Sequence, residues 1–265
     1  MCELLAMSSR HPTKLTSSLT VLASHAKGIS RDGWGVAFYR GNDVALYRDI
    51  TPADESHVVH FLESNGPTTT LSIAYIRHAT QGAIGFANTG PYTRELNGRM
   101  HVFAHNGSLT GLPRFHGKGR FLAVGETDSE QAFCLLLERM SKVSASNLLP
   151  SLEIRLNLVA EFAKELRSYG PASFIYSDGD LLFAYADRRI QPLTRQVSAP
   201  ALYRLECPVN KTPALVVDRL GSDEGKAQQV VLLASVPLTD EAWEPMPEGE
   251  LIAVRNGEVV STIQL

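Results

Sequence analysis

Cys2 follows the initiator Met1, and this position suggests covalent chemistry. If Met1 is removed, as we expect, Cys2 carries a thiol and a free α-amine on one residue. An α-amine has a pKa of roughly 7.7 to 8.0, so it can take the proton of the thiol and later return a proton to a leaving amine. The position of Cys2 alone favours the interpretation that it is an ordinary small residue. A role as nucleophile needs support from other residues of the chain.

Asn106 and Gly107 come directly after the apolar run 100–105, where the chain is expected to leave a strand. An Asn amide beside a Gly backbone N–H, with no Cβ in the way, can hold the oxyanion that forms when a thiolate attacks an amide carbon. The competing interpretation is a simple turn, because Asn-Gly is a common turn pair.

Two residues of opposite charge offer a way to hold an amino acid. Arg77 ends the apolar run 71–76, and a guanidinium at a strand end can bind a carboxylate through two hydrogen bonds. Asp128 stands where a helix should begin, and its oxygens can accept from an ammonium group. Asp128 with Gln131 also fits a helix-capping box.

A metal or cofactor site is not expected. The three cysteines are widely separated, form no CxxC pair and are odd in number, which argues against a disulfide framework and a cysteine zinc site. No GxGxxG sequence is present.

The segment Asp32-Gly33-Trp34-Gly35 is predicted to be a turn that enters a strand.

The elements that must position these residues are strands in the first and last thirds, with a helical pair between them. Helices are predicted at 51–62, 129–140 and 147–169. Strands are predicted at 33–39, 44–49, 71–77, 100–105, 173–176, 181–185, 202–206, 230–235 and 251–255. This order favours sheets packed against helical layers.

Composition excludes several classes of protein. Hydrophobic residues make up 44% of the 265 residues, enough for a large core and against extensive disorder. A net charge of −3 gives no basic excess for nucleic-acid binding. No apolar run is long enough to span a membrane, so we expect a cytoplasmic protein without membrane contact. We also expect residues 1–265 to form a single domain and to bind no nucleic acid.

The combined motifs resemble those of the class II glutamine amidotransferases, which are N-terminal-nucleophile enzymes, and are most similar to the stand-alone YafJ-type branch. The similarity covers nearly the whole chain. It rests on Met1-Cys2-Glu3-Leu4-Leu5, Asp32-Gly33-Trp34-Gly35, Arg77-His78-Ala79-Thr80, Thr93-Arg94-Glu95-Leu96, His105-Asn106-Gly107 and Val124 to Glu130.

The resemblance implies a four-layer αββα sandwich and a glutaminase that releases ammonia through a γ-glutamyl thioester. Cys2 would be the nucleophile, with Asn106 and Gly107 as the oxyanion hole. The remaining implied roles concern substrate binding: Arg77 would bind the α-carboxylate of glutamine and Asp128 its α-ammonium, while Thr80 and the loop with Gly33 and Trp34 would shape the pocket.

The sequence departs from the family at Gly90, where many members have His, and at His78 and Gln81. The small Gly90 suggests an alternative substrate, a γ-glutamyl peptide or conjugate with a larger leaving group. A second alternative is a non-catalytic glutamine-binding regulatory subunit. Since one glutaminase domain accounts for the whole chain, ammonia would pass to a separate synthetase partner.

Overall fold

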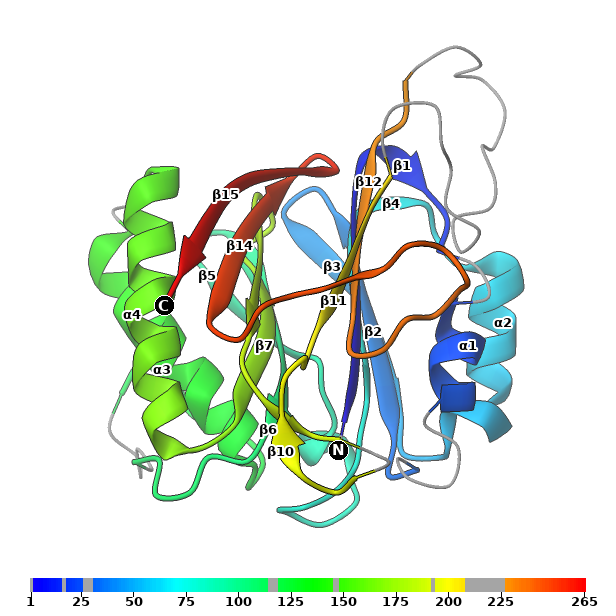
Figure 1. Cartoon of the computed structure of the whole chain (residues 1–265), viewed down its shortest axis with the longest axis horizontal. Helices are drawn as coiled ribbons and strands as arrows, with labels where there is room; N and C mark the ends of the chain where they lie inside the picture. The colour runs from blue at the N-terminus through cyan, green and yellow to red at the C-terminus, as the bar shows by residue number, and fades with distance from the viewer. Residues whose placement is uncertain are drawn as a thin grey trace.

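A computed structural model describes residues 2–15, 18–25, 31–113, 119–144, 148–191, 194–207 and 227–265. Met1, whose removal we expect, lies outside these ranges, as does Asn147, the first residue of one predicted helix. Within them, the helices and strands form four layers (Figure 1).

The first sheet is antiparallel and has seven strands, with the N-terminal strand β1 in the middle. β1 pairs with β12 on one side and with β4 on the other. In spatial order the strands are β13 (Glu244–Pro245), β11 (Tyr203–Cys207), β12 (Val230–Ala234), β1 (Glu3–Thr13), β4 (Thr69–Ile76), β2 (Trp34–Arg40) and β3 (Asp43–Asp49).

The second sheet is also antiparallel and has six strands. In order they are β15 (Glu258–Gln264), β14 (Glu250–Arg255), β8 (Leu182–Ala186), β7 (Ala172–Ser177), β6 (Arg99–Gly107) and β5 (Tyr92–Leu96). A separate pair of short strands joins β9 (Arg189–Ile190) to β10 (Val197–Ser198).

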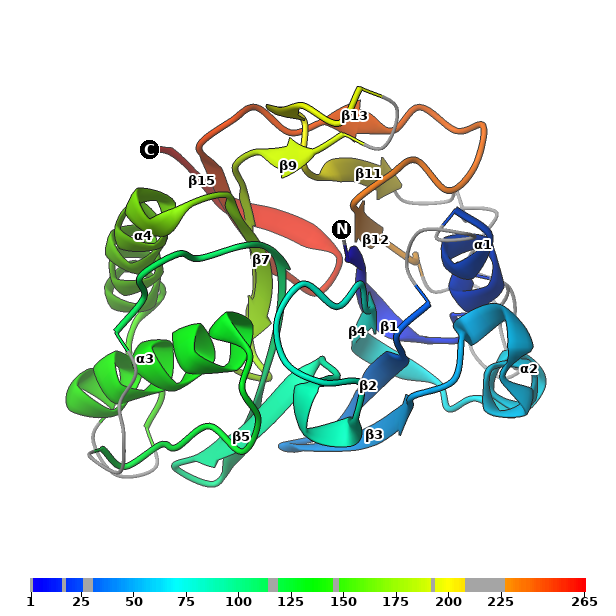
Figure 2. The same ribbon diagram turned by 90° about the horizontal axis from the view of Figure 1, so that it is seen from below.

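Helices cover the outer face of each sheet, as Figures 1 and 2 show. α1 (Ser18–His25) and α2 (His57–Asn65) lie on the first sheet, and α3 (Asp128–Val143) and α4 (Leu152–Tyr169) on the second. A third apolar cluster, which includes Leu4, Ala104 and Ile175, fills the space between the sheets. The predicted αββα sandwich is therefore confirmed. None of the described helices is long and apolar enough to cross a membrane.

Two predicted helices begin later than expected. Residues Ala53–Glu55 form a short 3-10 turn, and α2 starts only at His57. α4 starts after Ser151, whose hydroxyl accepts a hydrogen bond from the N–H of Ile154. Pro150 immediately precedes this cap, and the backbone before a proline is restricted away from helical geometry, which places the helix start after it.

A buried ion pair holds the start of β1. Arg189 is 1% exposed and donates to both carboxylate oxygens of Glu3, at 2.8 and 3.2 Å, and to the carbonyl of Ser235 at 2.8 Å. Removal of one partner leaves the other charge buried without compensation. The pair therefore ties β9 to the strand that carries Cys2.

We expect Glu3→Leu to lower the free energy of unfolding by about 3–5 kcal/mol, because Arg189 would remain buried and uncompensated. Urea unfolding measures this loss. Glu161→Gln is the matched control, because it breaks the exposed Glu161–Lys164 pair and should change stability by less than about 0.5 kcal/mol. Equal effects of the two substitutions would contradict the structural role of the buried pair.

Candidate active site

Cys2 lies immediately before β1, and contacts of the next two residues hold the start of that strand. Glu3 is in register with Ile76 of β4, and the N–H of Leu4 donates to the hydroxyl of Ser235 at 2.8 Å. Cys2 packs against the same inter-sheet cluster as Leu4 and Ala6, as strand alternation requires. The thiol is thus held between the two sheets.

Two donors face the Cys2 sulfur. The Tyr75 hydroxyl lies 2.9 Å from Sγ, and the backbone N–H of His78 donates to Sγ at 3.4 Å. Burial raises the pKa of the Cys2 thiol, while the hydrogen bonds from His78 and Tyr75 lower it. Burial also raises the pKa of Tyr75 well above its usual value, so its hydroxyl keeps its proton and can donate to a thiolate.

Tyr75 was not singled out from the sequence, because it is one of several apolar or aromatic residues within the run 71–76. Only the packing of β4 beside β1 shows that its hydroxyl reaches the thiol. Its ring also lies against Gly90, where a Cβ would be 3.2 to 3.4 Å from three ring atoms. A larger residue at position 90 would therefore press on the Tyr75 ring, and the hypothesis that Gly90 makes room for a larger leaving group stays a prediction.

Asn106 lies inside β6, paired with Ser173 of β7, so it belongs to a strand and not to the alternative turn. Its side chain lies on the same face of β6 as those of Val102 and Ala104, which face the space between the sheets. Asn106 is fully buried, and neither its amide nitrogen nor its side-chain oxygen has a hydrogen-bond partner among the described residues. Such a group is costly, which marks it as a donor available to a bound species.

Gly107 ends β6 at a point of close backbone approach. A Cβ there would lie 1.8 Å from the carbonyl oxygen of Pro171, so every larger residue is excluded. β6 packs across the sheets against β1 and β4, the strands next to Cys2 and Arg77. Figure 1 likewise places the N-terminus beside β6 at one end of the two sheets.

Arg77 follows β4 and is held by the loop before β2. Its N–H donates to the carbonyl of Gly33 at 2.8 Å, and Gly33 has a φ of +118° and would clash with Asp49 if it carried a Cβ. The guanidinium is buried and donates to the carbonyls of Gln81, Gly82 and Ala83 at 3.0 to 3.2 Å. These bonds use three of its five donors and hold the guanidinium in its loop.

The placement of Trp34 corrects the expectation that its side chain shapes the pocket. Trp34 lies on the same face of β2 as Val36 and Phe38. It packs with Leu19 and Leu22 of α1, on the helical side of the first sheet. Tyr75 packs in the inter-sheet cluster instead. The indole therefore belongs to the core, whereas the Asp32 side chain of the same loop accepts a hydrogen bond from the N–H of Ala79 at 2.7 Å, beside the candidate site.

Thr80 is exposed in the loop after Arg77. Asp128 is half-buried in the first turn of α3, and its two oxygens accept from the N–H groups of Leu109 and Ser129 at 2.7 and 2.8 Å. The alternative role of Asp128 as the helix cap is wrong, because Thr127 caps α3 and accepts from the N–H of Glu130. Asp128 is thereby left to face the loop that follows β6.

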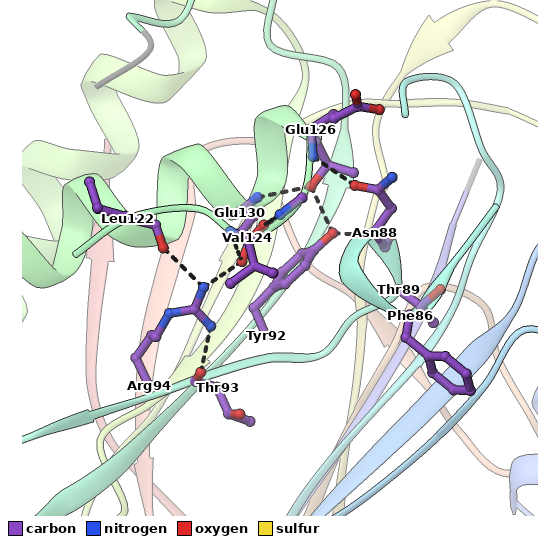
Figure 3. Close-up of polar contacts among 12 residues, drawn as sticks. Phe86, Asn88, Thr89, Tyr92, Thr93, Arg94, Leu122, Val124, Glu126 and Glu130 are labelled. Atoms are coloured by element: carbon purple, nitrogen blue, oxygen red, sulfur yellow. Dashed lines mark hydrogen bonds and ion pairs between the residues drawn. The ribbon is translucent and has the colours of Figure 1, made fainter. Parts of the chain in front are cut away.

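Asn88 joins the loop after Arg77 to the segment before Asp128. Its side chain donates to the carbonyl of Ala83 at 3.0 Å. It also accepts from the N–H of Glu126 at 2.7 Å (Figure 3). The Tyr92 hydroxyl bonds to the carbonyl of Asn88 and the hydroxyl of Thr127. The candidate residues for the two ends of an amino acid are thus supported by connected loops.

Comparisons with known proteins identify the family. The family model described as "Glutamine amidotransferases class-II" matches residues 1–265. The chain belongs to this family of amidotransferases. It is 33% identical to YafJ of Escherichia coli K12, named as a glutamine amidotransferase, over 94% of this chain and 96% of that protein.

Solved structures agree with this class II amidotransferase assignment. A crystal structure from Pseudomonas aeruginosa, described as a predicted glutamine amidotransferase, is 28% identical with a TM-score of 0.69 and covers 98% of this chain and 100% of that one. Glutamine phosphoribosylpyrophosphate amidotransferase of Bacillus subtilis is 13% identical, with a TM-score of 0.52 over 99% of this chain and 49% of that one, and shares the fold.

Tyr75→Phe is expected to raise the pKa of the Cys2 thiol further, because the thiolate loses a hydrogen bond. The pH dependence of Cys2 alkylation by iodoacetamide, followed by mass spectrometry, measures this shift to higher pH. Tyr39→Phe is the matched control, since that buried hydroxyl donates to the carbonyls of Met100 and Ser177. An unchanged Tyr75→Phe profile would remove Tyr75 from the site.

Proposed function

We propose that this amidotransferase hydrolyses the side-chain amide of glutamine to glutamate and ammonia, with Cys2 as the nucleophile. The observation that carries the proposal is that a hydrogen-bonded thiol and a buried Asn106 amide both face the space between the two sheets. The Asn106 amide has no hydrogen-bond partner among the described residues. A nucleophile next to a preorganised donor is the arrangement that acyl transfer needs.

In the first half-reaction the Cys2 sulfur attacks the δ-carbon of glutamine. After Met1 is removed, the α-amine of Cys2 accepts the thiol proton, the carbonyl oxygen becomes an oxyanion, and the Asn106 amide and the Gly107 N–H stabilise it. The C–N bond then breaks, the α-amine returns the proton to the nitrogen, and ammonia leaves. Cys2 remains bound as a γ-glutamyl thioester.

In the second half-reaction water attacks the thioester carbon. The α-amine takes a proton from the water, the same two donors stabilise a second oxyanion, and the C–S bond breaks. The α-ammonium returns the proton to the leaving sulfur, which gives glutamate and the free thiol. One set of donors therefore serves both steps. Tyr75 acts as a positioning residue that holds the sulfur through the hydrogen bond at 2.9 Å.

Charge complementarity supports glutamine as the substrate. The positive charge of the buried Arg77 guanidinium suits the α-carboxylate, and the half-buried Asp128 suits the α-ammonium. Thr80 would lie at the edge of the pocket. We further propose that residues 1–265 form one glutaminase domain that passes ammonia to a separate acceptor enzyme.

The decisive experiment combines intact mass with a diazo-ketone analogue of glutamine. We expect a mass that lacks methionine and then one covalent adduct per chain, because the freed Cys2 attacks an electrophile that the glutamine site holds. Cys2→Ala should form no adduct. Retained Met1 with no adduct on the unsubstituted protein would overturn catalysis and favour a glutamine-binding regulatory subunit.

Asn106→Ala should reduce kcat by a factor of 10² to 10³, or roughly 2.7–4 kcal/mol of transition-state stabilisation, with little change in KM. The expected split follows because the oxyanion exists only after attack. Glutamate release from glutamine measures both constants. Near-normal turnover would contradict the oxyanion role, whereas a loss confined to KM would make Asn106 a ground-state binding residue.

A further inference from the structure

A small cavity of about 90 Å³ lies between edge strands of the two sheets, apart from the Cys2 thiol and its hydrogen-bond partners. β3 contributes Arg48, and β5 contributes its first three residues. The lining consists of Arg48, Ala87, Tyr92, Thr93, Arg94, Val124 and Glu130. Figure 3 shows the β5 side of this cavity, with Arg94 directed toward Glu130 and Leu122.

The carboxylate in the cavity wall already has its partners. Glu130 is 1% exposed, and Arg94 donates to one of its oxygens. The N–H groups of Val124 and Gly125 donate to the same carboxylate at 3.0 and 2.6 Å. Arg94 also donates to the carbonyls of Thr93 and Leu122. Glu130 is thus committed to Arg94 and to the backbone.

Arg48 has no such carboxylate. One of its terminal nitrogens donates to the carbonyls of Phe86 and Thr89, at 3.1 Å each, and no acidic side chain of the described ranges lies within ion-pair distance of it. Burial lowers the pKa of Arg48, and the like charge of Arg94 lowers it further, against the opposite influence of Tyr92 and Glu130. Two guanidinium groups with one carboxylate leave this cavity with an excess positive charge.

We propose that this cavity is a binding site for a small oxyanion, a carboxylate or a phosphate, held between Arg48 and Arg94. Guanidinium groups bind both anions through paired hydrogen bonds. Thr93 is among the residues that line the same cavity. Ala87 and Val124 form apolar walls that limit the ligand to a small group.

The bound anion would connect the two segments that support the active site. Arg48 holds the carbonyls of residues 86 and 89, in the loop that Arg77 holds at residues 81–83. Arg94 and Glu130 hold residues 122, 124 and 125, just before Asp128. An anion across this gap would stiffen both segments, and any effect on glutamine binding rests on the proposed function.

The test measures binding of inorganic phosphate and of succinate by calorimetry, with KCl used to keep ionic strength constant. We expect saturable binding of at least one anion, equal in the unsubstituted protein and in Cys2→Ser. Arg48→Gln should weaken it roughly tenfold or more, because a charged hydrogen-bond donor is lost. Arg40→Gln, the same change at an exposed position at the far end of β2, should leave it unchanged.

Two further measurements keep the result independent of any folding defect in Arg48→Gln. Val124→Asp, at a residue 76% exposed, should also weaken binding by placing a negative charge beside the cavity. Hydrogen exchange on the unsubstituted protein should show that the anion protects residues 86–89 and 122–125.

Absence of saturable binding of both anions, or equal binding in Arg48→Gln, Val124→Asp and Arg40→Gln, would overturn the proposal. Binding of only one anion would identify the ligand class. Because the binding measurement needs no turnover, its failure is distinguishable from failure of Cys2 to form an adduct.

Discussion

The central position of β1 in its sheet is the constraint on which the rest of the structure depends. A strand with neighbours on both sides cannot shift its register without exchanging its two faces. Cys2 stands at the start of this strand, so pairing with β4, the Leu4 bond to Ser235 and the Glu3–Arg189 pair all fix the thiol. An N-terminal residue, commonly frayed, is thereby held in place.

This placement has an electrostatic cost that the surrounding groups offset. A thiol between two sheets resists ionisation, and burial accordingly raises the pKa of Cys2. The Tyr75 hydroxyl and the His78 N–H oppose that increase by donating to the sulfur. Asn106 is different, because its amide is fully buried but has no partner among the described residues. The Asn106 amide can therefore donate to an anion that develops beside the sulfur.

The residues proposed to bind substrate lie on loops that polar contacts hold. Arg77 donates to three carbonyls of its own loop, and Asn88 connects that loop to the segment before α3. The same two segments line the cavity that contains Arg48 and Arg94. The positions proposed to bind opposite ends of an amino acid are therefore connected through a short hydrogen-bond network.

The order of local motifs resembles that of the class II glutamine amidotransferases, and this resemblance predicted the family and the αββα sandwich, both of which are confirmed. The roles of Cys2, Asn106, Arg77 and Asp128 come from the same resemblance and stay predictions. The contact of Tyr75 with the thiol, the orientation of Trp34 toward α1 and the contact of the Tyr75 ring with Gly90 depend on tertiary structure. Alternation along a strand separates two faces, but only the packing of sheets and helices decides what each face meets.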